Sequence, residues 1–236
     1  MLKKLVVPVV AVVVVLVGAF WWFVLRDDAP DKLSVGSGSS TTIGETPESL
    51  DGSWAVGPDS GSTAGFRITE SFAGGLTDHE AVGRSTGVTG SFTIEGTTVT
   101  TGQFTVDLTQ LEFTDDPGLP VANRVRALQD RGLQTSEFPE ASFELTEPID
   151  FGAEPEAGKT IDATATGELT LHGVTNEITF PVQAVLNGNT IQIGTNPDDL
   201  PEVVLADYDI EAPTTQMVAS VSDTGTFEFL VTVTQL

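Results

Sequence analysis

The sequence GELTLHGVTNEITFPV, residues 167–182, decides the fold. At its start, Leu169 and Leu171 alternate with Glu168 and Thr170, so one face of the segment is apolar and the other is polar. A period of two is typical of antiparallel strands that cover a core with one face and meet water with the other. This stretch therefore predicts a β-sheet with a single buried side.

The same alternation recurs in four other runs of the chain. Large apolar side chains share one face of each run, while Thr, Glu and Asp occupy the other. Turn-forming residues lie between the runs, as in Asn187-Gly188-Asn189, where hairpin turns are expected. The chain is therefore predicted to be all-β. The candidates for its inner face are Phe92, Ile94, Phe104, Val106, Leu108, Phe143, Leu145, Leu169, Leu171, Phe227, Phe229 and Val231.

The composition excludes several classes of function. The 236 residues include 34 Asp and Glu against 10 Lys and Arg, which gives a net charge of −24. Binding to nucleic acid needs clustered basic residues, so a nucleic-acid partner is not expected. The absence of Cys rules out disulfides, thiolate metal sites and cysteine nucleophiles.

Residues 5–25 form an uncharged apolar run that predicts a transmembrane helix. Twenty-one residues in a helix span roughly 31 Å, close to the hydrocarbon thickness of a bilayer. Lys3 and Lys4 precede the run, which favours a cytoplasmic N-terminus and a C-terminal part outside the cell. A cleavable signal peptide is the alternative, but the aromatic cluster at residues 20–23 favours a retained single-pass anchor in the cell membrane.

Three segments follow from this reading. Residues 1–28 comprise a cytoplasmic stub and the anchor, and residues 29–49, rich in Ser, Thr and Gly, are predicted to be a flexible linker. Residues 50–236 are long enough for one sizeable core.

One segment of this domain breaks the alternation. In residues 121–132, Val121, Val125 and Leu128 recur at helical spacing, and Gly132 is a plausible C-cap. This predicts a short surface helix over one end of the sheet structure, with its arginines paired to carboxylates. The alternative is that this arginine-rich segment contacts an anionic ligand or headgroup.

Three elements in order resemble the YceI-like polyisoprenoid-binding family: Trp54, then LQTSEFPEASFEL (133–145), then GELTLHGVT (167–175). The resemblance covers roughly residues 50–236. It implies an eight-stranded antiparallel barrel, similar to a lipocalin, with an isoprenoid chain inside. The family often has Arg-Asp-x-His-Leu in its helical segment, whereas this chain reads Arg-Val-Arg-Ala-Leu at 124–128.

The expected function is therefore that of a membrane-tethered lipid-binding protein outside the cytoplasm. Its barrel would hold a quinone or polyprenyl lipid for transport, storage or stress protection, with the twelve inner-face candidates as the ligand-binding residues. No other cofactor is expected. The alternative is a membrane-anchored β-sandwich with a solid core that serves interaction or adhesion, because alternation alone does not distinguish the two.

No catalytic or metal constellation is apparent in the sequence. His79 lies between Asp78 and Glu80, which indicates a surface loop more than a metal site, since adjacent residues do not converge on one ion. His172 is interpreted as a hydrogen-bonded structural histidine at a strand end. The sequence does not predict an enzyme.

Overall fold

The structure is a computed structural model. It describes residues 29–36, 47–73, 78–118 and 123–236. The predicted anchor at residues 5–25 and part of the predicted linker lie outside these ranges. Within them, no helix combines the length and the apolar character needed to cross a bilayer.

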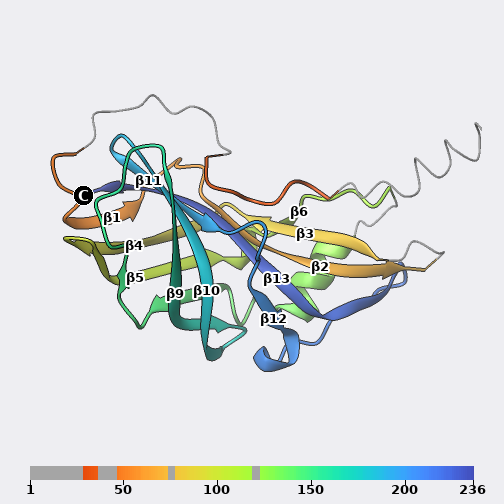
Figure 1. The fold of residues 1–236 in the computed structure, drawn as a ribbon. Coiled ribbons are helices and arrows are strands. Elements are labelled where there is room, and N and C mark those ends of the chain that lie inside the picture. The colour runs from red at the N-terminus through yellow and green to blue at the C-terminus, as the bar shows by residue number, and fades with distance from the viewer. Residues whose placement is uncertain (1–28, 37–46, 74–77, 119–122) are drawn as a thin grey trace, which may run out of the picture.

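Eight antiparallel strands close into a barrel in the order β1-β4-β5-β7-β9-β10-β11-β13, and β13 pairs with β1 to complete the ring (Figure 1). The all-β barrel predicted from the family resemblance is confirmed, and the β-sandwich alternative is wrong. The strands are β1 (Gly52–Val56), β2 (Thr63–Phe72), β3 (His79–Ser85), β4 (Val88–Glu95), β5 (Thr98–Asp107), β6 (Glu112–Phe113), β7 (Glu140–Leu145), β8 (Ile149–Asp150), β9 (Thr160–Leu171), β10 (Val174–Asn187), β11 (Thr190–Thr195), β12 (Glu202–Val204) and β13 (Val218–Gln235).

The long strand β13 links the two halves of the barrel. One edge pairs first with β2 and then with β1, and the other pairs with β12 and β11. β3 pairs with β2, and β6 pairs with β3, so the wall continues past the ring of eight. This extension makes the barrel elongated, as Figure 1 shows.

The hairpin between β9 and β10 explains why residues 167–182 are decisive. His172 and Gly173 have φ of 53° and 76°, the left-handed pair that a two-residue hairpin turn requires. A Cβ on Gly173 would lie 2.6 Å from the Phe138 ring, so glycine is needed there for space as well. The predicted structural role of His172 is confirmed, since its Nδ1 donates to the Tyr208 carbonyl at 3.1 Å.

Short helical segments cover one end of the barrel. α2 (Arg124–Ala127) continues into η2 (Leu128–Gly132), and η1 (Leu108–Gln110) and η3 (Leu205–Tyr208) lie beside them. Leu108, Leu133 and Tyr208 form a buried cluster at this end. The predicted short helix is therefore confirmed, although residues 119–122 before it lie outside the described ranges.

The opposite end is packed around Trp54. This side chain is completely buried, and its indole Nε1 donates to the Leu50 carbonyl at 2.9 Å. Phe92, Ile94 and Val233 pack in the same cluster. The middle of the barrel, between this cluster and the helical end, contains the candidate site.

Candidate ligand cavity

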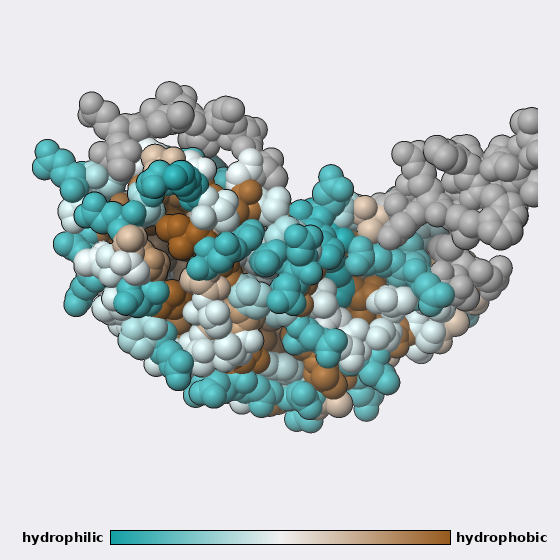
Figure 2. Space-filling model, viewed as in Figure 1, coloured by the Kyte–Doolittle hydropathy of each residue, from teal (hydrophilic) through white to brown (hydrophobic). Residues whose placement is uncertain are grey.

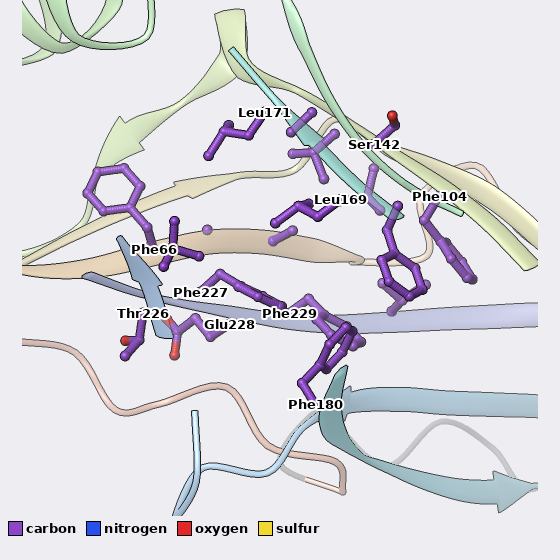
Figure 3. Close-up of a pocket in the computed structure, with 18 of the residues that line it drawn as sticks. Phe66, Phe104, Ser142, Leu169, Leu171, Phe180, Thr226, Phe227, Glu228 and Phe229 are labelled. Atoms are coloured by element: carbon purple, nitrogen blue, oxygen red, sulfur yellow. The ribbon is translucent and has the colours of Figure 1, made fainter. Parts of the chain in front are cut away.

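A cavity of about 380 Å³ runs inside the barrel. Its wall is formed by side chains from β2, β4, β5, β7, β9, β10, β11 and β13. All twelve residues named from the sequence lie on this wall, where Phe104, Leu169 and Phe229 face the same space (Figure 3). The structure thus brings the twelve together, while their contact with a ligand stays a prediction.

Aromatic rings concentrate in the middle of the cavity. The Phe180 ring lies 5.3 Å from that of Phe143 and 5.1 Å from that of Phe227, both in edge-to-face geometry. Phe229 lies 6.3 Å from Phe180 on another side. Such pairs add about 0.5–1.5 kcal/mol each beyond simple burial, so they stabilise this part of the wall.

Small residues on β9 leave room inside the barrel. Ala163, Ala165 and Gly167 occupy alternate inward positions on this strand. A Cβ at Gly167 would lie 2.5 Å from the Phe143 ring, so the glycine allows that ring to approach the β9 backbone closely. The open interior is thus a consequence of which positions carry small side chains.

Several lining residues were missed from the sequence. Phe180 and Val182 alternate along β10, but Pro181 between them weakened the strand signal. Ala163 and Ala165 were overlooked because alanine contributes little to an apolar pattern. Other lining residues not named from the sequence are Phe66, Leu111, Phe113, Leu133, Ile161, Ala184, Leu186, Ile191, Ile193, Leu205 and Ile210.

Buried charges mark the helical end of the cavity. Arg124 of α2 is 5% exposed, with its Nε 2.9 Å from Glu70 Oε2 and its Nη1 2.7 Å from Asp115 Oδ2. The guanidinium also lies 3.7 Å from the centre of the Phe113 ring. His79 Nε2 is 2.8 Å from Asp115 Oδ2. We call Glu70, His79, Asp115 and Arg124 the Arg124 cluster.

Two sequence interpretations need correction here. Arg124 is not a surface arginine, because its side chain turns into the barrel, where the carboxylates of Glu70 and Asp115 compensate its charge. His79 does not lie in a surface loop, because it starts β3 and is 6% exposed. Both errors arose because partners distant in sequence leave no local pattern.

The two carboxylates of the Arg124 cluster titrate differently. Burial raises the pKa of the Glu70 carboxyl above its usual value, and the attraction of Arg124 only partly opposes this. Burial acts in the same direction on Asp115, but hydrogen bonds from His79, Arg124 and the Val82 amide outweigh it and lower the pKa of Asp115. Within the described residues, no group of three or more His, Cys, Asp or Glu is arranged to hold a metal.

A second charged cluster lies on the outer wall. Glu228 on β13 is completely buried and accepts hydrogen bonds from Arg67 Nε and Arg84 Nε, each at 2.9 Å. Arg67 Nη1 also donates to Glu80 Oε2 at 2.6 Å. We call Arg67, Glu80, Arg84 and Glu228 the Glu228 cluster. By strand alternation these side chains point away from Phe66 and Phe227, which face the cavity.

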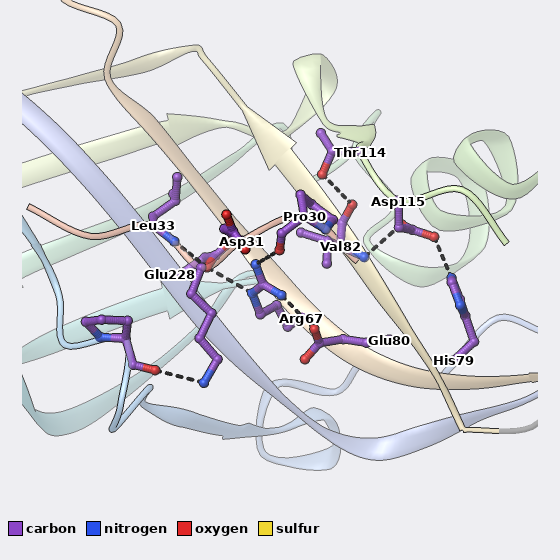
Figure 4. A network of polar contacts seen from close by, with 12 residues as sticks. Pro30, Asp31, Leu33, Arg67, His79, Glu80, Val82, Thr114, Asp115 and Glu228 are labelled. Carbon is purple, nitrogen blue, oxygen red and sulfur yellow. Dashed lines mark hydrogen bonds and ion pairs between the residues drawn. The ribbon is translucent and has the colours of Figure 1, made fainter. Parts of the chain in front are cut away.

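Residues 29–36 cover the Glu228 cluster, and we call them the strap (Figure 4). Arg67 Nη2 donates to the Pro30 carbonyl, and Arg84 Nη2 donates to the Asp31 carbonyl, both at 2.6 Å. In addition, the Leu33 amide donates to Glu228 Oε2 at 3.1 Å. The sequence assigned this stretch to a flexible linker, but it makes specific contacts with the barrel wall.

Opposite the helical end, the loop between β7 and β9 borders the cavity. Ile149 of β8 and the following Phe151 and Pro155 are half-buried and line the cavity. Figure 2 shows apolar surface recessed among hydrophilic residues at the end of the barrel where β1 lies. A chain-like ligand therefore has an apolar path from this rim toward the Arg124 cluster.

Comparison with known proteins agrees with this architecture. A model of the YceI-like domain matches residues 54–233. A polyisoprenoid binding domain from Saccharophagus degradans superposes with a TM-score of 0.60 at 16% identity, covering 78% of this chain and 98% of that one. BcnA from Burkholderia cenocepacia gives 0.48 at 17% identity, with coverages of 72% and 95%. A search of the curated proteins finds no match.

Proposed function

Because the chain belongs to the YceI-like domain family, we propose that its barrel binds a polyisoprenoid lipid, either a quinone or a polyprenyl lipid, along the inner cavity. The observation that carries the proposal is the cavity itself, about 380 Å³ with a wall of aromatic and aliphatic side chains. This volume falls within the usual range of ligand sites, roughly 300–1,000 Å³.

The energetics favour a hydrocarbon ligand. A prenyl chain gains about 0.8 kcal/mol for each CH₂ group removed from water and needs no polar partner in return. The wall offers this environment through Phe104, Phe143, Phe180 and Phe229. The neighbouring fold from Saccharophagus degradans is described as polyisoprenoid binding, which supports the same ligand class.

The proposal includes the cellular setting. Residues 5–25 anchor the protein in the cell membrane as a single-pass helix with a cytoplasmic N-terminus, and the barrel lies outside the cytoplasm. There it holds the isoprenoid lipid for transport, storage or stress protection. The length and apolar character of residues 5–25 support this arrangement.

A cavity-filling pair of variants tests lipid binding. Ala163→Phe places a ring in the cavity, whereas Thr164→Phe places the same ring on the exposed face of β9. We expect Ala163→Phe to reduce bound geranylgeraniol at least tenfold and Thr164→Phe to leave it unchanged. Both are measured by lipid extraction from the purified full chain, with circular dichroism to confirm folding. Equal occupancy in two folded variants would contradict binding inside the barrel.

A further inference from the structure

We infer that the ligand of this cavity carries an uncharged head group, such as an alcohol or a quinone, and that prenyl phosphates and diphosphates are excluded. The inference rests on the proposed lipid binding and narrows it to one chemical class. It follows from the charges around the cavity, because recognition of a phosphate needs basic side chains or amides that are free to bind it.

The basic side chains of the wall are already paired with carboxylates. Among the described lining residues, four are charged: Arg67, Glu70, Arg124 and Glu228. Arg67 pairs with Glu228 and Glu80 on the outer side of the wall. Its remaining nitrogen, Nη2, donates a hydrogen bond to the Pro30 carbonyl of the strap. Arg67 is therefore directed away from the ligand space.

The charge of Arg124 is already compensated, although its buried Nη2 makes no hydrogen bond within the described residues. It lies between the carboxylates of Glu70 and Asp115, so two negative groups surround one positive group. A phosphate beside Arg124 would meet these carboxylates at close range in a poorly hydrated site, where like charges repel strongly. A neutral head group avoids this cost.

The other arginines of the helical segment do not form an anion site together with Arg124. Arg126 points to solvent with 81% of its side chain exposed and pairs weakly with Asp130 at 3.7 Å. Arg131 donates to the Thr214 carbonyl at 2.8 Å. Neither is part of the cavity wall. The arginine-rich sequence is therefore divided between the interior and the surface.

The rim at the opposite end is acidic. Phe151 and Pro155 line the cavity, and exposed acids adjoin them directly: Asp150 before Phe151, and Glu154 and Glu156 on either side of Pro155. Lys159 in the same loop forms an ion pair with Glu156. A head group emerging here would meet a negative field, which weakens anion binding and leaves a neutral group unaffected.

The test compares two lipids with the same chain. Geranylgeraniol and geranylgeranyl monophosphate are each incubated with the delipidated full chain in a nonionic detergent at low salt, and bound lipid is quantified after gel filtration. We expect the alcohol to bind at least tenfold more tightly. Equal or tighter binding of the monophosphate would overturn the inference. Binding of neither lipid would overturn the proposed function itself, so the two failures are distinguishable.

Charge reversal locates the effect. The double variant Glu154→Lys/Glu156→Lys alters the rim, and Glu168→Lys/Glu177→Lys makes the same change in charge on exposed positions of β9 and β10 that do not line the cavity. We expect the rim variant, but not the control, to reduce the affinity difference between the alcohol and the monophosphate by about threefold or more. An equal effect of both variants would show that net charge, rather than the rim, disfavours the phosphate, and would overturn the role given to this loop.

Discussion

The Arg124 cluster inside the barrel and the Glu228 cluster on its outer wall use the same chemistry but are completed by different parts of the chain. In the first, a helix supplies the arginine, and Glu70 and Asp115 supply the carboxylates. In the second, the arginines and carboxylates lie on β2, β3 and β13, and the strap backbone satisfies the remaining donors and acceptors. The first cluster closes the end of the cavity, and the second attaches a peripheral segment.

This difference leads to different expectations on mutation. Removing one member of a buried ion pair costs about 3–5 kcal/mol, because the remaining charge is left without compensation. Inside the barrel His79 contacts Asp115, but Glu70 would lose the arginine with which it is paired. On the outer wall, release of the strap allows water to reach the charges. A substitution in the Arg124 cluster should therefore lower the free energy of unfolding more than one in the Glu228 cluster.

The largest effect is expected for Arg124→Met. The variant leaves Glu70 and Asp115 buried beside each other without their shared cation, so the free energy of unfolding should fall by about 3–5 kcal/mol. Arg126→Met is the matched control, because Arg126 is exposed and its pairing is long. Denaturant unfolding of the full chain measures both. Similar losses in the two variants would contradict the assigned role of Arg124.

A smaller loss is expected for Arg84→Gln in the outer cluster. It removes hydrogen bonds to Glu228 and to the Asp31 carbonyl, and bonds to charged groups contribute about 1.5–3 kcal/mol each. Because the side chain is 16% exposed, we expect the lower part of this range.

In the Arg84→Gln variant, the strap should become more susceptible to proteolysis than the barrel. In limited proteolysis, cleavage within residues 29–36 should precede any cleavage of the barrel, as judged by fragment mass. Lys32→Gln is the control, since the hydrogen bond that Lys32 donates among the described residues is an exposed one to the Pro197 carbonyl. If the strap of the Arg84 variant is cut no faster than that of the wild type, its attachment does not depend on the Glu228 cluster.

The smallest expected effect is a change in how the free energy of unfolding depends on pH. Burial raises the pKa of folded Glu70 above 4.5, so the folded state keeps a proton that the unfolded state has already released. The contribution of this group to stability is therefore present at low pH and is lost as the pH rises through the folded pKa. Glu70→Gln does not titrate. Its unfolding free energy, relative to the wild type, should rise between pH 4.5 and 7.

Denaturant unfolding at a series of pH values checks this sign. Asp115 has the opposite dependence, because its depressed pKa gives stability that is lost as the pH falls below its usual value of 3.8. It is present in both proteins, so its effect largely cancels in the comparison. A stability difference that stays constant with pH would contradict the role given to Glu70.

The two clusters also show what sequence reasoning reaches. Alternation along the strands correctly assigned Phe104, Leu169 and Phe229 to one wall, because a period of two specifies the face without knowledge of the partner strand. The charged clusters gave no such signal. Arg124 and Glu70 are 54 positions apart, and Arg67 and Glu228 are 161 apart, so only the closed barrel brings them together.

Burial of charge was the second source of error. Acidic and basic residues are expected at the surface, and Glu228 follows the alternation as an outward-facing residue. It is nevertheless fully buried, because the strap crosses over it. A segment rich in small and polar residues gives no indication that it will dock, since its contacts are made mainly by backbone groups.

If residues 5–25 span the membrane as proposed, the docked strap limits how far the barrel can lie from the bilayer. Only Arg26, Asp27 and Asp28 separate the proposed membrane span, which ends at Leu25, from the strap, which starts at Ala29. Three residues reach about 10 Å at full extension, whereas a free linker over residues 29–49 would have a root-mean-square span of roughly 23–27 Å. The proposed anchor would then hold the barrel wall beside the headgroups at nearly fixed distance and orientation. Lipid would pass between membrane and cavity over a short, geometrically defined gap.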